Sequence, residues 1–383
     1  MKYGKRNQIK IDPLAYNLML TGESGIGKTT IIKEYCEKLA GKDGYIFLNM
    51  GKEDGYDAIH DIQYLNCYEW EADYEDDNTS IGFNTFVEDV CENRTTDWKE
   101  LKVVVVDTYD ELIAIAEPEV IRMHNRENPT KPPIRSIKAA FGGFQGGEDK
   151  TIEIVLDALW RLKKVGVSFI VIGHTKSRNV TDPVTGEDYL QLTTNISQKY
   201  FNAIKTKVHI LGVASIDREI VKEKTGKKNV VTNQDIKKGV VKSESRKITF
   251  RDDNYVIDSK SRFSDIVSNI PMDSDALIKA ITDAITSEFN KSGKSIDEVK
   301  EEQDKEQIRK LENIAEAEEK NKIEKELKSI ISEIKSYIDE NKSNLDKIKP
   351  LAAMSKEMGY PNPLSIDKIS DAKQILELID TLK

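Results

Sequence analysis

The sequence predicts an α/β fold with a mainly parallel central sheet, followed by a helical C-terminal extension. From about residue 17 to residue 257, short apolar runs rich in β-branched residues alternate with helical patterns. Buried parallel strands and the helices that cover them produce this alternation. After Pro271 the periodicity is helical throughout, and residues 295–322 contain mainly Glu and Lys.

The composition limits the kind of protein this is. The chain has 383 residues, a formal net charge of −9 and 33% charged residues, so any nucleic-acid site must be a local basic patch. The three cysteines are scattered and odd in number, which favours reduced thiols over a zinc site. With no apolar leader and no run approaching about 20 apolar residues, we expect a cytoplasmic protein without a membrane partner.

The elements of the sheet follow in order along the chain. Each predicted helix lies between strands, beginning after Lys28 and near Phe83, Glu111, Thr151 and Ser197. Short runs at 247–251 and 255–257 predict an antiparallel edge hairpin. The strongest predicted strands are 17–20, 45–48, 102–106, 168–172 and 207–213.

A complete G-x-x-x-x-G-K-[ST] motif lies between the first predicted strand and the first helix. Its glycines let backbone N–H groups turn toward phosphates, and the N-terminus of the following helix adds positive potential. Lys28 is then expected to reach the β- and γ-phosphate oxygens, and Thr29 to bind Mg²⁺. The predicted nucleotide-binding residues are Gly22, Glu23, Ser24, Gly25, Ile26, Gly27, Lys28, Thr29 and Thr30.

Polar residues at the ends of three other predicted strands complete the expected site. Asp107 ends a run of four valines, as a Walker B carboxylate does, and is predicted to share the Mg²⁺ shell with Thr29. Either Glu53, our preferred candidate, or Glu111 would orient the attacking water. His174 follows another apolar strand and is predicted to sense the γ-phosphate, although a structural histidine would also suit that position.

The motifs GESGIGKTT, VVVVDTYDEL, VIGHTKSR and SKSRFSDI occur in an order that resembles the RecA-like AAA ATP-binding proteins of bacteriophages. That group includes phage RecA-like single-strand-annealing recombinases, and the resemblance covers roughly residues 14–270. It implies a RecA-like P-loop ATPase that uses ATP and Mg²⁺ in a bacterial host cell, and it favours Glu53 over Glu111. It further implies that Lys260 or Arg262 reaches the nucleotide of a neighbouring subunit as a charge-neutralising finger.

The partner expected from the resemblance is single-stranded DNA. Residues 218–247 contain ten Lys or Arg and four Asp or Glu, a local charge of about +6 that would attract phosphates. Two further candidates are the glycine-rich insertion at 127–150 and the pair Lys176 and Arg178. Each of these segments also has a simpler interpretation, namely a solvated loop or a lid over the nucleotide.

The predicted domains are a RecA-like ATPase at 1–270, a charged helical linker at 271–322 and a small helical module at 323–383. Amphipathic spacing in the last segment requires a partner, either within the module or in a coiled coil. Two other functions remain open. The chain would be an ATP-gated assembly protein that recruits a partner through its C-terminal helices, or a P-loop kinase for a small molecule.

Overall fold

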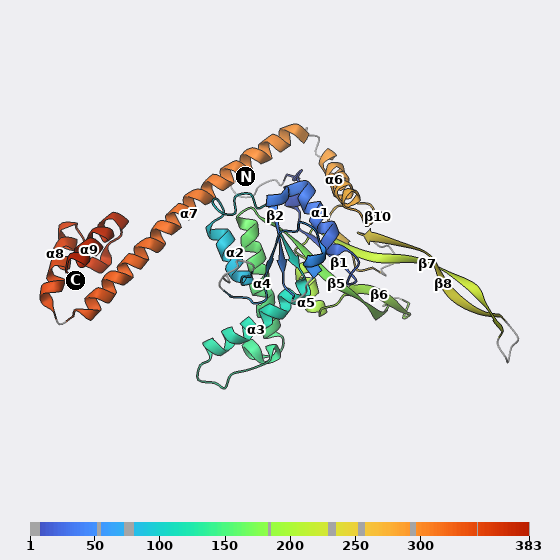
Figure 1. The fold of residues 1–383 in the computed structure, drawn as a ribbon, viewed down its shortest axis with the longest axis horizontal. Coiled ribbons are helices and arrows are strands. Elements are labelled where there is room, and N and C mark those ends of the chain that lie inside the picture. Colours follow the sequence, from blue (N-terminus) through green and yellow to red (C-terminus); the bar gives the residue numbers. More distant parts are fainter. Residues whose placement is uncertain are drawn as a thin grey trace. The chain divides into compact units, whose positions relative to one another are not determined.

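The computed structural model describes residues 8–51, 55–72, 80–182, 185–228, 235–251, 257–291, 296–342 and 344–382, with the backbone alone over 218–241. The chain divides into two compact units, Met1–Gln307 and Ile308–Lys383. The first unit contains the sheet, and the second is helical. The predicted α/β fold with a helical C-terminal region is therefore confirmed (Figure 1).

The sheet of the first unit is parallel at its centre and antiparallel at one side. Its described strands lie in the order β10-β8-β7-β1-β5-β4-β2-β3, with β6 paired to β5 and β9 paired to β7. The strand carrying Asp107, β4, is separated from the P-loop strand β1 by β5. The strands are β1 (Leu18–Gly22), β2 (Tyr45–Asn49), β3 (Tyr64–Asn66), β4 (Val103–Asp107), β5 (Ser168–Thr181), β6 (Asp188–Thr194), β7 (Ile210–Lys228), β8 (Asp235–Thr249), β9 (Lys260–Ser261) and β10 (Asn269–Pro271).

Helices cover both faces of this sheet, which explains why its central strands are continuous apolar runs. In β4, Val104 and Val106 join one core, whereas Val103 and Val105 join the other. The first core also contains α2, α3, α4 and α5, and the second contains α1 and α6. These helices are α1 (Lys28–Ala40), α2 (Phe83–Glu92), α3 (Tyr109–Glu127), α4 (Gly146–Lys164), α5 (Gln198–Lys205) and α6 (Ser274–Asn290).

Two antiparallel ribbons leave the sheet on either side of the P-loop strand. Gly22 at the end of β1 is in register with His174 of β5 and with Ala214 of β7. Beyond these residues, β5 continues paired with β6, and β7 continues paired with β8 (Figure 1). Both strands are longer than the sequence predicted. The prediction located strands by their apolar runs, and the part of each strand that lies outside the core has no such run. Residues 247–249, predicted as an edge hairpin, belong to β8, while 252–256 lie outside the described residues.

Helix α6 lies within the stretch that the sequence assigned to a linker. Leu277, Ile281 and Ile285 are buried in the second core, so α6 is part of the first unit. The helix α7 (Ile296–Glu340) follows and continues past Gln307 into the second unit. There its last turns form a core with α8 (Leu345–Glu357) and α9 (Ile369–Leu382).

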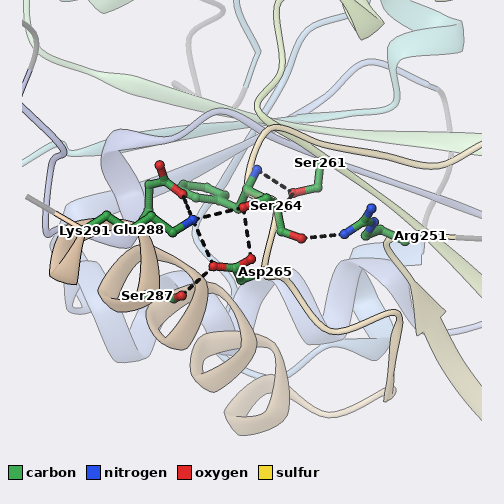
Figure 2. A network of polar contacts seen from close by, with 8 residues as sticks. Arg251, Ser261, Ser264, Asp265, Ser287, Glu288 and Lys291 are labelled. Carbon is green, nitrogen blue, oxygen red and sulfur yellow. Dashed lines mark hydrogen bonds and ion pairs between the residues drawn. The ribbon is translucent and has the colours of Figure 1, made fainter.

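A polar network fastens the C-terminal end of α6 to the segment after β9 (Figure 2). Asp265 accepts hydrogen bonds from Ser287 at 2.7 Å and Ser264 at 3.0 Å, and its Oδ2 lies 3.0 Å from the Lys291 ammonium. The Arg251 guanidinium donates to the Ser264 carbonyl. The hydrogen bonds from Ser287, Lys291 and Ser264 lower the pKa of Asp265 to about 2.

Replacing Asp265 with Asn is expected to lower the melting temperature at pH 7. Because the folded-state pKa is lowered, the carboxylate stabilises the fold above its ordinary value of 3.8, and this contribution is lost as pH falls toward 2. Thermal unfolding at pH 7 and pH 3 should therefore show a smaller difference between variant and wild type at pH 3. Asp283→Asn, on the neighbouring helix α6, is the control. Equal melting temperatures at pH 7 would contradict the prediction.

Candidate nucleotide site

The phosphate-binding motif forms a loop between β1 and α1, at the carboxyl edge of the parallel strands. Gly25 has φ 72° and Gly27 has φ 106°, the left-handed region in which a side chain would be strained. Gly27 is also the N-cap of α1, and its carbonyl accepts the hydrogen bond from the Ile31 N–H at 3.1 Å. The N-terminus of α1 therefore opens directly onto this loop.

Lys28 folds back over the loop that precedes it. Its Nζ donates to the carbonyl of Gly22 at 3.0 Å and to the carbonyl of Glu23 at 2.9 Å, and the residue is 6% exposed. These contacts hold a buried positive charge beside the loop, where phosphate oxygens are expected. The contact of Lys28 with the phosphates stays a prediction.

Thr29 and Asp107 come together as predicted, although they are far apart in sequence. The Thr29 hydroxyl donates to Asp107 Oδ2 at 2.8 Å, and the Tyr56 hydroxyl donates to the same oxygen at 3.0 Å. Burial raises the pKa of the Asp107 carboxyl, while those two hydrogen bonds and the charges of Lys28 and His174 act in the opposite direction. The sequence analysis missed Tyr56, which lies in the short 3-10 helix Gly55–Ala58, because no motif links this residue to Asp107.

His174 is anchored by Asp110 at the start of α3. Asp110 Oδ2 accepts from the His174 backbone N–H at 2.9 Å and lies 3.2 Å from His174 Nδ1. The sequence analysis also missed Asp110; its place three residues after Asp107 was the available signal. Of the two glutamates considered for water activation, Glu111 lines the cavity, whereas Glu53 lies outside the described residues.

These side chains surround a cavity of about 400 Å³. Thr108 is one of the lining residues, and its buried hydroxyl has no hydrogen-bond partner among the described residues. Among those residues no group of three His, Cys, Asp or Glu could hold a metal. A threonine hydroxyl, one carboxylate and substrate phosphates, the ligands that Mg²⁺ commonly takes, fit this donor set. The cavity is lined by Ser24, Gly25, Gly27, Lys28, Thr29, Thr30, Asn49, Gly51, Gly55, Tyr56, Ala58, Ile59, Asp107, Thr108, Glu111 and His174.

Lys260 and Arg262 lie at the amino ends of the parallel strands, whereas the P-loop lies at their carboxyl ends. Lys260 is paired with Leu211 near the start of β7 and donates to the carbonyls of Lys205 and Val208. Arg262 donates to the Thr206 carbonyl at 2.8 Å. Both side chains therefore cap the C-terminal end of α5, and neither lines the cavity of its own chain.

The other predicted DNA-contacting residues differ in exposure. Lys176 is exposed on the β5–β6 ribbon, whereas Arg178 on the same ribbon donates to the carbonyls of Thr194 and Ile196. In the insertion at 127–150, Phe144 is fully exposed, but the Phe141 ring packs edge-on against His124.

A protein-family model described as "AAA domain" matches residues 14–263, which include the P-loop, Asp107, His174 and Lys260. The chain belongs to this AAA domain family. Residues 14–263 are thus an AAA-type P-loop domain, and the family implies a nucleotide and usually Mg²⁺.

No curated protein matches this AAA domain protein. Among solved structures, the flagellar accessory protein FlaH from Methanocaldococcus jannaschii is similar, with 10% sequence identity and a TM-score of 0.26. The match covers 64% of this chain and 83% of FlaH. In the described part of the chain, no helix has the length and apolar character needed to cross a membrane.

Proposed function

We propose that this AAA domain protein is a Mg²⁺-dependent ATPase that binds single-stranded DNA and acts in phage-type recombination, annealing or replication. The observation that carries the ATPase part is the meeting of Lys28, Thr29 and Asp107 at one edge of the sheet. Lys28 would hold the β- and γ-phosphates, and Thr29 with Asp107 would hold Mg²⁺, which supplies charge stabilisation in phosphoryl transfer. Glu53 or Glu111 would orient the attacking water, and His174 would contact the γ-phosphate.

The ribbon formed by β7 and β8 supports the DNA part of the proposal. It contains most of the lysine-rich segment 218–247 and begins beside the end of the P-loop strand. A basic ribbon of this kind suits a phosphate backbone, which proteins bind through counterion release without reading sequence. Its place next to the P-loop would allow the nucleotide state to influence strand binding.

Self-association would bring Lys260 and Arg262 to a nucleotide. Because both residues lie at the edge of the sheet away from their own P-loop, their proposed finger role requires the nucleotide of a neighbouring subunit. The carbonyl contacts that they make at the end of α5 would have to be exchanged for phosphate oxygens. A role of this kind predicts that the rate of ATP hydrolysis per subunit rises with protein concentration.

The decisive experiment measures ATP hydrolysis with and without single-stranded DNA at low and moderate salt. We expect DNA to stimulate hydrolysis and salt to weaken the effect. The affinity for single-stranded DNA is measured over the same salt range. Replacing three ribbon lysines together, as Lys237→Gln, Lys238→Gln and Lys242→Gln, should make the plot of log DNA affinity against log salt less steep by about 2, at roughly 0.7 for each phosphate contact.

The matched control removes three lysines from α6 and α7, as Lys279→Gln, Lys300→Gln and Lys305→Gln. This variant has the same net charge as the ribbon variant, so it separates local contact from overall charge. Hydrolysis that is indifferent to DNA, or equal loss of DNA affinity in both triple variants, would contradict the proposal.

The separate C-terminal unit supports a second candidate function. Residues 308–383 have their own core, formed by α7, α8 and α9, as expected of a module that recruits a protein partner. An ATP-gated assembly protein would show slow hydrolysis without DNA stimulation. It would also bind a partner through the full chain and lose it when residues 308–383 are removed.

A further inference from the structure

Arg246 connects the β7–β8 ribbon to the P-loop. It lies on β8 opposite Ile216 of β7, and its Nη1 donates to the carbonyl of Ile26 at 3.0 Å. The Arg246 carbonyl in turn accepts from the Met272 N–H at 3.0 Å, so the segment after β10 holds the backbone at this point. No local sequence pattern indicates this contact, which joins residues 220 positions apart.

The carbonyl that Arg246 contacts belongs to the peptide unit between Ile26 and Gly27. A trans peptide is planar, so its C=O and N–H point in opposite directions. In a P-loop the backbone N–H groups face the phosphates. Arg246 is not among the residues that line the cavity, so its contact holds the Ile26 carbonyl away from the cavity and directs the Gly27 N–H toward the side where phosphates bind.

This peptide benefits from an external contact for two reasons. Gly27 has φ 106° and no side chain, so the local backbone has more freedom than at other residues. A guanidinium also makes a charge-assisted hydrogen bond, which polarises the peptide and makes its N–H a better donor. The same contact thus orients the N–H and strengthens it.

We propose that Arg246 is a positioning residue for phosphate binding, supplied to the P-loop by the β7–β8 ribbon. It acts through the Ile26–Gly27 peptide rather than by touching the nucleotide. The inference rests on the proposed binding of ATP at the P-loop. It also implies that a ligand that moves β8 at Arg246 changes the affinity of the P-loop for phosphate.

The test is competition of ATP, ADP and AMP against a fluorescent ATP analogue on the full-length chain with Mg²⁺. Arg246→Gln should weaken ATP and ADP about tenfold, the scale of one charge-assisted hydrogen bond. AMP should be unaffected, because it lacks the phosphates that the P-loop holds. Arg246→Lys should recover part of the loss, since it keeps the charge but not the planar fork.

Arg122 on α3 provides the matched control, because it is another arginine outside the ribbon. Its Nε makes an ion pair with Glu119 at 2.8 Å, and the residue does not line the cavity. Arg122→Gln should therefore leave all three affinities unchanged. If Arg246→Gln bound ATP as tightly as the wild type, the role of Arg246 would be overturned and the proposed function would stand. An equal loss of affinity for ATP, ADP and AMP would have the same consequence. A wild-type chain that fails to bind ATP would overturn both the inference and the proposed function.

Discussion

Replacing Lys28 with alanine is expected to reduce ATP hydrolysis by about a hundredfold or more, the scale on which one preorganised donor acts on a developing negative charge. The Lys28 ammonium is buried beside the loop and is held by the Gly22 and Glu23 carbonyls. No other side chain of the motif brings a positive charge to this point. Steady-state phosphate release with saturating Mg²⁺ and ATP measures the effect.

Lys33→Ala is the matched control for Lys28→Ala. Lys33 is on the same helix α1 and makes an ion pair with Glu37 at 3.0 Å, away from the cavity-lining residues. We expect it to hydrolyse ATP like the wild type. Retained hydrolysis in Lys28→Ala, with a cooperative unfolding transition showing that the variant is folded, would contradict the role assigned to this lysine.

Replacing Asp107 with Asn is expected to affect activity and stability in opposite directions. Hydrolysis should fall by roughly a hundredfold or more, because the amide keeps an acceptor for Thr29 but loses the charge that Mg²⁺ requires. The melting temperature of the nucleotide-free chain at pH 7 should rise, because the variant no longer buries an ionised carboxylate. Phosphate release and thermal unfolding are the two measurements.

The stability effect has a defined dependence on pH. Burial raises the folded-state pKa of Asp107 above its ordinary value of 3.8, so wild-type stability falls as pH rises through the interval between those two values. Below pH 3.8 the wild-type carboxyl is protonated, and the difference from Asp107→Asn should disappear. Asp157→Asn, an exposed residue of α4, should change neither measurement. A lower melting temperature for Asp107→Asn at pH 7 would contradict the argument.

The cores of the strands could be predicted because burial on both faces requires continuous apolar runs. The run from Val103 to Val106 is the clearest case, since alternate valines enter opposite cores. The ends of β5 and β7 could not be predicted in the same way. Beyond His174 and Ala214 these strands are polar ribbons whose pairing depends on a second strand rather than on a core.

The site shows the same division between local pattern and tertiary contact. Thr29 and Asp107 were predicted together because both follow strands whose carboxyl ends meet at one edge of a parallel sheet. Tyr56 and Asp110 were not predicted, because their roles depend on how a short helix and a helix N-terminus lie over that edge. The role of Glu53 stays a prediction.

By itself the sequence determined the P-loop, the Asp107 strand and the alternation of strands and helices, since each follows from the conformational and burial preferences of neighbouring residues. Only the tertiary structure decided that β5 lies between β1 and β4, that Lys260 and Arg262 cap α5, and that Arg246 reaches the Ile26 carbonyl. The physical reason is that these contacts join distant parts of the chain. Their geometry is fixed by strand order and packing, which no local pattern of residues encodes.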